Sequence, residues 1–573
     1  MLQTLTTPRG ETLSGTPWQV YPRPQMRRDS YINLNGEWDF AVSSGKPETF
    51  DMRILVPFCP ESRLSGIGRH FEEGAPLWYR RRFLLPEGFR RERVLLHIGA
   101  ADQIAEVFVN GQHLCRHEGG YASFCVDITE ALAEENELVI RCIDDLHDQA
   151  FPYGKQVMNR GGMWYTPVSG IWQTVWLESV PETYIEKLSI ENHGASVTIS
   201  TVPPLDGTVS VEQLGQFPLE NGRVTIAPEN PHFWCPDDPY LYRFTVETAQ
   251  DKVESYFAIR SLEIKKVGEY PRLCLNGKPY FFHGLLDQGY WPEGLLTAPA
   301  PESYADDILA MKRLGFNTLR KHIKVEPEEF YYQCDRLGMI VWQDMVNNGS
   351  YSYFRDTVLP TIGIQKWNDR QLHLDERSRN AFRRGAADAV NQLKNHPCIC
   401  YWTIFNEGWG QFDSDRVCGW FRTLDATRFI DTTSGWFRGK NTDVDSRHQY
   451  FGKLRLEGDG LRPLVLSEFG GKTWRVEGHI FNPDKTYGYG ACPTREALNE
   501  AVAVLYRESI VPAVEKGLCA AIYTQVSDVE DEVNGLITYD RRVVKLDADT
   551  MLPISRALQD AMEKTVASFE KMG

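Results

Sequence analysis

The second half of the sequence alternates short apolar segments with amphipathic ones, and this alternation constrains the fold more than any other feature. Helix candidates separate several of the strand candidates, and an eightfold alternation of this kind predicts a (β/α)₈ barrel. A doubly wound nucleotide-binding sheet would give a similar pattern but needs a glycine-rich phosphate loop after a strand, and the sequence has none. The strand candidates are residues 279–284, 317–320, 339–344, 399–405, 429–433, 446–450, 464–468 and 519–525. The helix candidates are residues 302–314, 327–337, 377–395, 415–424 and 495–516.

The part of the chain before residue 265 has a different pattern, made of short strands and turns. The pair Asn110-Gly111 stands between two apolar segments, and both residue types accept the positive φ of a tight hairpin turn. Turns rich in Pro, Asp and Gly separate further short strands after residue 181. We therefore expect three domains: a jelly-roll β-sandwich at 1–180, an immunoglobulin-like β-sandwich at 181–265 and a catalytic barrel at 266–573.

Charge and hydropathy exclude several classes of protein. The 573 residues include 62 basic and 78 acidic ones, a formal net charge of −16, which disfavours binding to a nucleic-acid backbone. No run of apolar residues is long enough to span a membrane, and the N-terminus lacks the pattern of a signal peptide. The 12 cysteines are scattered without a Cys-x-x-Cys pair. We read them as reduced thiols and expect a cytoplasmic protein.

Two glutamates follow apolar strands where the chemistry of a barrel is expected. Glu407 comes at the end of the fourth strand candidate and Glu468 at the end of the seventh. Active sites of such barrels lie at the C-terminal ends of the strands, so both carboxylates should face the same opening. A pair of carboxylates is what glycoside hydrolysis needs, one as acid and base and the other to attack the anomeric carbon.

These segments resemble glycoside hydrolase family 2, which contains β-galactosidases, β-glucuronidases and β-mannosidases, in a short three-domain form. The resemblance covers nearly the whole chain. It is carried by Leu34-Asn35-Gly36-Glu37-Trp38-Asp39-Phe40, Val56-Pro57-Phe58, Trp78-Tyr79-Arg80-Arg81, Gly170-Ile171-Trp172, His283-Gly284, Gly315-Phe316-Asn317-Thr318-Leu319-Arg320, Asn406-Glu407 and Ser467-Glu468-Phe469-Gly470.

The resemblance implies a retaining exo-β-glycosidase that works by double displacement through a covalent glycosyl-enzyme. Glu407 would be the acid/base and Glu468 the nucleophile. Asn406 would hydrogen-bond the sugar 2-hydroxyl, Tyr450 the nucleophile, and Arg320 would order the nucleophile from the second strand. A catalytically silent carbohydrate-binding protein on the same scaffold is the rival from another class.

Departures from the family pattern bear on the substrate. Lys321 and His322 follow Arg320 where relatives usually have Ser-His-Tyr-Pro, and Trp164 stands near the place of a jelly-roll aspartate. The Asn-x-Lys motif that reads the sugar carboxylate in β-glucuronidases is missing, because Leu536 stands two positions after Asn534.

Basic residues nevertheless gather around the expected opening. Ordinary paired loop charges would explain them, and an acidic sugar would explain them too. We expect a galacto-configured substrate, a β-galacturonide or a β-galactoside, with a β-glucuronide or β-mannoside as the alternative. The basic residues are Lys321, Lys324, Arg438, Lys440, Arg447, Lys472 and Arg475.

The remaining expectations concern aromatic residues, metals and partners. Most of the 15 Trp, 25 Tyr and 28 Phe suit a large core. Four tryptophans lie at or near predicted strand ends, and we expect one or two of them to stack on the sugar: Trp342, Trp409, Trp436 and Trp474. Trp402, inside a strand, suits the barrel core. We expect no metal or other cofactor, although a divalent cation near the acid/base stays an open alternative. The expected partner is a carbohydrate substrate, without nucleic acid or membrane, and a homo-oligomer is left open.

Overall fold

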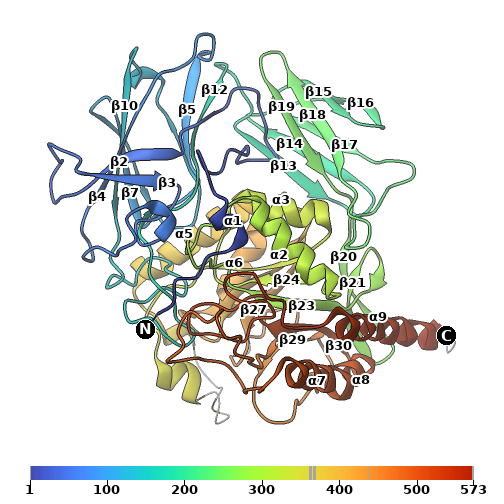
Figure 1. The fold of residues 1–573 in the computed structure, drawn as a ribbon. Helices are drawn as coiled ribbons and strands as arrows, with labels where there is room; N and C mark the ends of the chain where they lie inside the picture. Colours follow the sequence, from blue (N-terminus) through green and yellow to red (C-terminus); the bar gives the residue numbers. More distant parts are fainter. Residues whose placement is uncertain (1, 360–363, 365–368, 438, 571–573) are drawn as a thin grey trace.

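The computed structural model describes residues 2–359, 364, 369–437 and 439–570, and it divides into two β-sandwiches beside a barrel. In Figure 1 the two sandwiches, coloured blue to green, lie next to each other on one side of the barrel, coloured green to red. None of the helices in the described ranges combines the length and the hydropathy that crossing a membrane requires.

The first sandwich has a four-stranded sheet of order β1-β12-β5-β9 and a six-stranded sheet of order β3-β2-β4-β10-β7-β8. The predicted hairpin is present, because Val109 pairs with Gln112 across the turn at Asn110-Gly111. The elements are α1 (Pro8–Glu11), β1 (Ile32–Asn33), β2 (Gly36–Val42), β3 (Met52–Val56), η1 (Arg63–Ser65), β4 (Leu77–Phe83), β5 (Arg93–Ile98), β6 (Ala101–Asp102), β7 (Ile104–Val109), β8 (Gln112–Glu118), β9 (Phe124–Asp127), η2 (Thr129–Ala131), β10 (Asn136–Ile143), β11 (Gly170–Ile171) and β12 (Val175–Val180).

The second sandwich packs a three-stranded sheet, β13-β14-β17, against a four-stranded one, β16-β15-β18-β19. A small sheet of β20, β21 and β22 then leads into the barrel. The strands are β13 (Lys187–Asn192), β14 (Val197–Val202), β15 (Gly207–Val211), β16 (Gly215–Leu219), β17 (Arg223–Ile226), β18 (Tyr242–Thr248), β19 (Lys252–Phe257), β20 (Leu262–Val267), β21 (Tyr270–Leu275) and β22 (Lys278–Pro279).

The barrel is a parallel sheet of eight strands in the order β27-β26-β25-β24-β23-β30-β29-β28. The two end strands also contact each other, so the barrel is nearly closed. Burial on both faces explains why these strands are almost wholly apolar along β26 and β30. The strands are β23 (Phe282–Asp287), β24 (Thr318–Lys321), β25 (Ile340–Asp344), β26 (Ile399–Asn406), β27 (Phe429–Ser434), β28 (Asp445–Gln449), β29 (Leu464–Gly470) and β30 (Leu518–Thr524).

The helices follow the expected alternation with two differences. The segment predicted as one helix at 495–516 contains a π-helical turn, and a long final helix, α9, follows the last strand. The first strand also lies three residues later than predicted, so His283 and Gly284 stand inside it and not at its end. The helical elements are α2 (Glu302–Arg313), α3 (Glu328–Leu337), η3 (Tyr353–Val358), η4 (Asp369–Gln371), α5 (Glu376–Leu393), α6 (Ser414–Leu424), α7 (Arg495–Leu505), η5 (Tyr506–Ile510), α8 (Val511–Glu515) and α9 (Ala548–Glu570).

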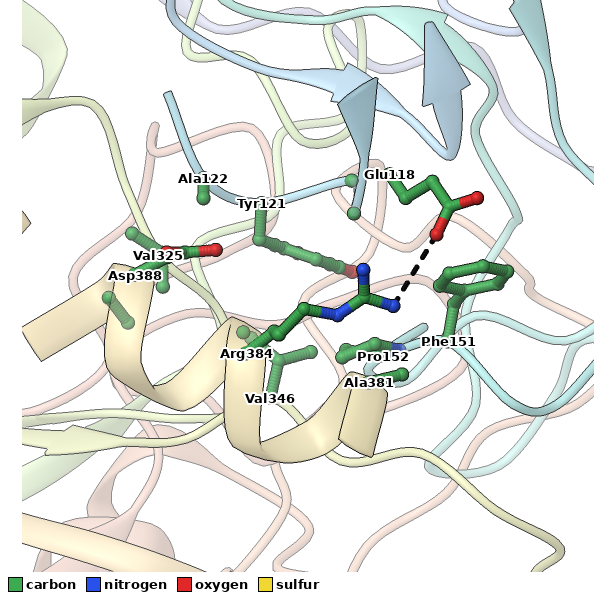
Figure 2. Close-up of a pocket in the computed structure, with 14 residues that line it drawn as sticks. Glu118, Tyr121, Ala122, Phe151, Pro152, Val325, Val346, Ala381, Arg384 and Asp388 are labelled. Carbon is green, nitrogen blue, oxygen red and sulfur yellow. Dashed lines mark hydrogen bonds and ion pairs between the residues drawn. The ribbon is translucent and has the colours of Figure 1, made fainter. Parts of the chain in front are cut away.

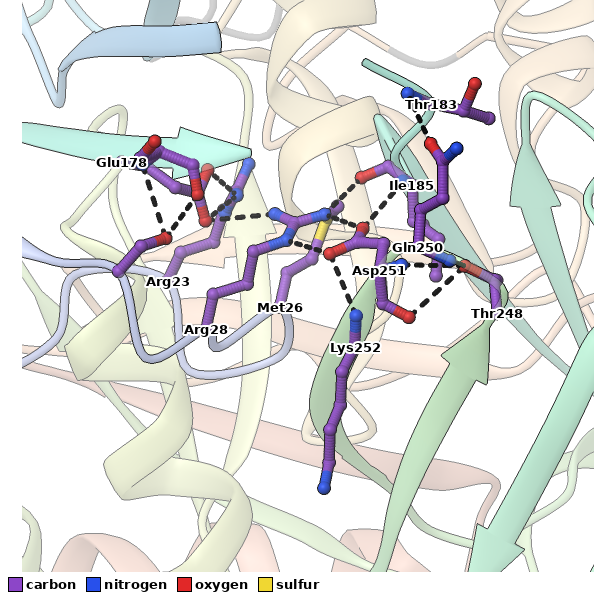
Figure 3. Close-up of polar contacts among 12 residues, drawn as sticks. Arg23, Met26, Arg28, Glu178, Thr183, Ile185, Thr248, Gln250, Asp251 and Lys252 are labelled. Atoms are coloured by element: carbon purple, nitrogen blue, oxygen red, sulfur yellow. Dashed lines mark hydrogen bonds and ion pairs between the residues drawn. The ribbon is translucent and has the colours of Figure 1, made fainter. Parts of the chain in front are cut away.

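A buried ion network joins the two sandwiches through the N-terminal segment (Figure 3). The Arg28 guanidinium contacts Glu178 of β12 at 2.9 Å and Asp251, between β18 and β19, at 2.7 Å. The same group donates to the carbonyl of Ile185 at 2.7 Å, and Arg23 adds a second cation to Glu178 at 3.0 Å. Burial alone would raise the pKa of Glu178, but the charges of Arg23 and Arg28 and the bond from His97 outweigh it and lower that pKa.

Replacing Arg28 should therefore destabilise the fold strongly. Arg28→Met leaves the carboxylates of Glu178 and Asp251 buried with less compensation, which costs about 3–5 kcal/mol. The matched control is Arg9→Met, since the Arg9–Asp306 pair is about half exposed and such pairs contribute about 0–1 kcal/mol. Differential scanning calorimetry of both variants checks the difference; equal unfolding temperatures would contradict it.

Candidate active site

The two glutamates stand at the C-terminal opening of the barrel, on strands four and seven. Glu407 directly follows β26 and adopts a left-handed φ of 51°. A non-glycine residue in that region costs energy and persists where the surroundings impose it, here through the bond from Glu407 N to Ser434 O at 2.8 Å. Glu468 lies within β29. Their side chains differ in exposure, 23% for Glu407 and 6% for Glu468.

Glu468 is held by two donors from different strands. Arg320 of β24 contacts its Oε1 at 2.9 Å, and the Tyr450 hydroxyl, just beyond β28, donates to its Oε2 at 2.6 Å. Burial alone would raise the pKa of Glu468, but the positive charges of His448, Arg320 and His322 and the Tyr450 bond outweigh it and lower the pKa to about 2. Glu468 is therefore a carboxylate at ordinary pH, as a nucleophile must be.

His448 of β28 lies between the two glutamates, and sequence reasoning missed it. Its Nδ1 is 2.8 Å from Glu407 Oε1 and 3.5 Å from Glu468 Oε2. The ligand atoms of these three residues lie within 4.8 Å of one another, close enough to hold a metal ion. Both ring nitrogens already have protein partners, because Nε2 is 2.9 Å from Ser434 Oγ. The protein's own hydrogen bonds therefore account for this cluster.

Arg320 also orders the amide of Asn406. Its Nη2 donates to Asn406 Oδ1 at 2.8 Å, and because a guanidinium carries only donors, the oxygen of the amide is the atom that faces it. The NH₂ group of Asn406 therefore faces away from the guanidinium of Arg320. Asp344 of β25 accepts from Arg320 Nε at 3.0 Å and is 2.8 Å from His322 Nδ1. Burial lowers the pKa of His322.

A loop of the first sandwich, residues 150–169, lies across the barrel opening. The Tyr153 hydroxyl donates to Gly349 O at 2.7 Å, and Gly154, at φ 66°, approaches the carbonyl of Ile323 so closely that a Cβ would lie 3.1 Å from it. Trp164 sets its ring edge-on against Trp409 at 4.8 Å, so this predicted site residue belongs to the wall of the opening. On the other side Thr166 N donates to Glu530 at 3.0 Å. The opening is therefore built by two domains.

The basic residues predicted at the rim are mostly engaged elsewhere. Lys321 is 1% exposed, and its Nζ lies 2.6 Å from Asp287 and 2.9 Å from Glu326, while Lys324 shares Glu326 at 2.8 Å. This corrects the expectation that Lys321 and Lys324 add positive charge at the rim: two buried acids neutralise them. Arg447 is paired with Asp445 at 2.7 Å.

The other predicted residues differ in their distance from the glutamates. Trp436 lies edge-on to His448, with ring centroids 5.6 Å apart, and so belongs to the site. Trp474 is partly buried and packs against the barrel core. Lys472 is half-buried and its ammonium lies beside Gly490. Arg438 lies outside the described residues.

Figure 2 shows a separate hollow between the first sandwich and α5. Apolar side chains such as Tyr121, Phe151 and Val346 line it, and an ion pair between Arg384 and Glu118 at 3.4 Å stands at its edge. Neither glutamate lines this hollow, so it is a feature of the contact between the two domains and not of the candidate active site.

The Tyr450 hydrogen bond gives a prediction for pH dependence. Tyr450→Phe removes a donor to the charged form of Glu468, so the pKa of Glu468 should rise from about 2 towards its ordinary value. The acid limb of kcat/KM, which reports a base that must be ionised, should therefore move to higher pH, and the maximum should fall roughly 10-fold.

The matched control for this measurement is Tyr489→Phe. The Tyr489 ring stacks on Tyr450 at 3.8 Å, but its hydroxyl is 3.4 Å from that of Tyr487, with no bond to Glu468 among the described contacts. Its acid limb should stay in place in a pH–rate series from pH 2 to 7, which includes the pKa of Glu468. An unchanged limb in Tyr450→Phe would contradict the role given to that hydroxyl.

Comparison with known proteins gives a match for each of the three domains. Residues 266–456 match the sequence model described as glycosyl hydrolases family 2, TIM barrel domain. Residues 70–160 match the galactose-binding domain-like model of glycosyl hydrolase 2, and residues 183–260 match the model described as glycosyl hydrolases family 2. The three matches follow the order of the three domains and together cover more than half of the chain.

Curated relatives are more distant. A β-galactosidase from Thermoanaerobacter pseudethanolicus is 24% identical over 358 residues, which are 57% of this chain and 44% of that protein. A β-glucuronidase from Bacteroides fragilis is 22% identical over 415 residues, 66% of this chain and 56% of that protein. The chain thus spans about half the length of these relatives.

Solved structures show the same fold over nearly the full length. A β-glucuronidase from an uncultured Clostridium species superposes with a TM-score of 0.71 at 18% identity, covering 96% of this chain and 100% of that one. A β-galacturonidase from Eisenbergiella tayi superposes with a TM-score of 0.65 at 18% identity, covering 95% and 98%. With three domain matches in the right order and this shared fold, the chain belongs to glycoside hydrolase family 2.

Proposed function

We propose that the protein is a retaining exo-β-glycosidase with Glu468 as nucleophile and Glu407 as acid/base. The observation that carries the proposal is the pairing of the two carboxyl groups, which have oxygens within 4.8 Å of each other. Retaining enzymes place these groups about 5–5.5 Å apart, whereas inverting ones leave about 6.5–9.5 Å for a water molecule. The difference in exposure between the two glutamates supports the assignment of roles.

The proposed reaction has two steps, formation of a glycosyl-enzyme and its hydrolysis. In the first, a Glu468 oxygen forms a bond to the anomeric carbon while the bond to the leaving oxygen breaks, and Glu407 gives its proton to that oxygen. In the second, Glu407 takes a proton from water, the water oxygen attacks the anomeric carbon, and Glu468 leaves as a carboxylate. Arg320 and Tyr450 hold Glu468 in place, and the NH₂ group of Asn406 is available to the sugar 2-hydroxyl.

For the sugar, we propose a β-galacturonide, with a neutral β-galactoside as the second candidate. Asn534 is fully buried against Gln525, 2.8 Å away, and Leu536 stands where the Asn-x-Lys motif would place a lysine. This departure argues against the usual glucuronidase arrangement. The names of the superposable structures include both a β-glucuronidase and a β-galacturonidase, which supports an acidic sugar.

All twelve cysteines are free thiols, which supports the further proposal of a reducing, cytoplasmic setting. Cys400 of β26 and Cys398, directly before this strand, are fully buried in the barrel core. A carbohydrate is the partner that the proposed reaction requires.

A panel of p-nitrophenyl β-glycosides tests the proposal. The galacturonide, galactoside, glucuronide, glucoside and mannoside are compared by kcat/KM, and the anomeric form of the first sugar released is followed by NMR. We expect a preference for the galacturonide and release of the β-anomer. Release of the α-anomer would contradict retention, and activity confined to the mannoside would contradict the galacto-configured substrate.

A further inference from the structure

The loop that crosses the barrel opening carries a lysine, Lys155, to which the reaction above assigns no role. Its backbone carbonyl accepts from Tyr165 N at 3.0 Å, which ties the two arms of the loop together. The preceding residue, Gly154, lies against the carbonyl of Ile323, next to His322. The Tyr165 hydroxyl in turn donates to Glu532, in the segment after β30. Lys155 thus stands between the ends of β24 and β30.

The charge of Lys155 acts on groups of the site itself. After burial, it is the next cause that lowers the pKa of His322, whose ring faces Asp344. Burial raises the pKa of Glu532, and the charge of Lys155 is the main influence that opposes this rise. Both influences agree with the contacts of Gly154 and Tyr165, which place this part of the loop between the ends of β24 and β30.

The ammonium of Lys155 forms no ion pair with any described acidic residue. Among the described residues, Lys155 Nζ has no ion-pair partner within 4.0 Å and no hydrogen-bond acceptor, and the side chain is half-buried. Glu532 is already engaged by Tyr165 and, at 3.4 Å, by the amide of Asn534. Arg160, on the same loop, is by contrast paired with Asp531 at 2.9 Å. Lys155 therefore offers an uncompensated positive charge at the opening.

We propose that Lys155 binds the carboxylate of a β-uronide substrate and sets the preference for acidic over neutral sugars. The inference rests on the proposed function, because it names the group that selects the sugar at the same site. A lysine ammonium binds a carboxylate as a point charge, and the low water content of a half-buried site strengthens that attraction. Burial of Glu532, which favours its neutral form, reduces the repulsion that this acid would exert on the substrate.

Lys472, the lysine predicted at the rim, is less suited to this task. It too has no ion pair among the described residues, but its ammonium lies beside Gly490, and its charge acts on the thiol of Cys492. Neither contact is a carboxylate of the site. Lys472 is therefore the matched control: a half-buried lysine near the same opening whose loss should not affect the sugar carboxylate.

The test compares Lys155→Met and Lys472→Met with the wild-type enzyme on two substrates that differ only in the charged group, p-nitrophenyl β-galacturonide and β-galactoside. We expect Lys155→Met to lower kcat/KM for the galacturonide about 10- to 100-fold, the range for a hydrogen bond to a charged group. The galactoside value should change less than about threefold. Lys472→Met should change neither. Binding of galacturonate to Glu468→Gln proteins with and without Lys155→Met, measured by calorimetry, gives a readout independent of turnover.

The outcomes separate the two proposals. An equal loss on both substrates, or an unchanged galacturonide value, would overturn the role of Lys155 while leaving the glycosidase function intact. If the wild-type enzyme hydrolyses none of the β-glycosides, the proposed function itself fails. Thermal unfolding of each variant identifies a loss that comes from the fold, and Lys155→Arg, which keeps the charge, should restore most of the galacturonide activity.

Discussion

Glu468→Ala should abolish turnover of every β-glycoside that the enzyme accepts, by a factor on the order of 10⁵ or more. The reason is that no other group can form the bond to the anomeric carbon: Glu468 is the carboxylate that Arg320 and Tyr450 hold in place. Measurement of kcat with p-nitrophenyl substrates checks the loss. The control is Glu477→Ala, since Glu477 is exposed in the loop after β29 and should keep the wild-type rate.

Azide tests whether Glu468 acts as the nucleophile, and not only whether turnover requires it. In Glu468→Ala the space left by the carboxylate admits a small anion, which attacks the anomeric carbon once and gives an α-glycosyl azide. NMR identifies the configuration of that product. A β-glycosyl azide from this variant, or turnover at the rate of the Glu477→Ala control, would contradict the assignment of the nucleophile.

Glu407→Ala should give the second largest loss, but one that depends on the leaving group. General acid–base catalysis contributes roughly 10²–10⁴-fold, so substrates with a poor leaving group should slow by that factor. A dinitrophenyl substrate needs no proton on its leaving oxygen, and its first step should stay close to the wild-type rate. Pre-steady-state kinetics should then show a burst of dinitrophenol followed by slow hydrolysis of the glycosyl-enzyme.

Azide should again separate the roles, with the opposite result. In Glu407→Ala the glycosyl-enzyme still forms on Glu468, so azide attacks from the other face and gives a β-glycosyl azide. Glu457→Ala, at an exposed position after β28, is the control for loss of a carboxylate near the opening. Equal losses for good and poor leaving groups would argue that Glu407 does not deliver the proton.

Periodicity was sufficient to predict the barrel but not the limits of its strands. Alternating apolar and amphipathic segments identify strands buried on both faces, and the eight strands form as expected. The predicted first strand begins three residues before β23 because Tyr280 and Phe281 extend its apolar segment towards the N-terminus. Its limits are set by partners far away in sequence, since Phe282 pairs with Ala520 of β30 and Gly284 with Thr318 of β24.

The site divides in the same way into local and distant contributions. Glu407 and Glu468 could be selected because a carboxylate after a buried strand is a local signal. No local sequence pattern identifies His448 or Lys155, because the role of each depends on contacts with residues of other elements. The opposite error concerns the lysines predicted at the rim. The sequence predicts that Lys321 is exposed, but in the fold its Nζ lies 2.6 Å from Asp287, a residue 34 positions earlier.

The N-terminal segment has a consequence for the order of assembly. It contacts every domain: Gln3 N donates to Phe481 O, Trp18 to Ala298 O, and Arg28 to Glu178 and Asp251. Domains generally fold from the N-terminus during synthesis, yet these first residues must wait for partners that leave the ribosome hundreds of residues later. We therefore expect residues 3–28 to complete their contacts late in folding, after the segment that contains Phe481 has been synthesised.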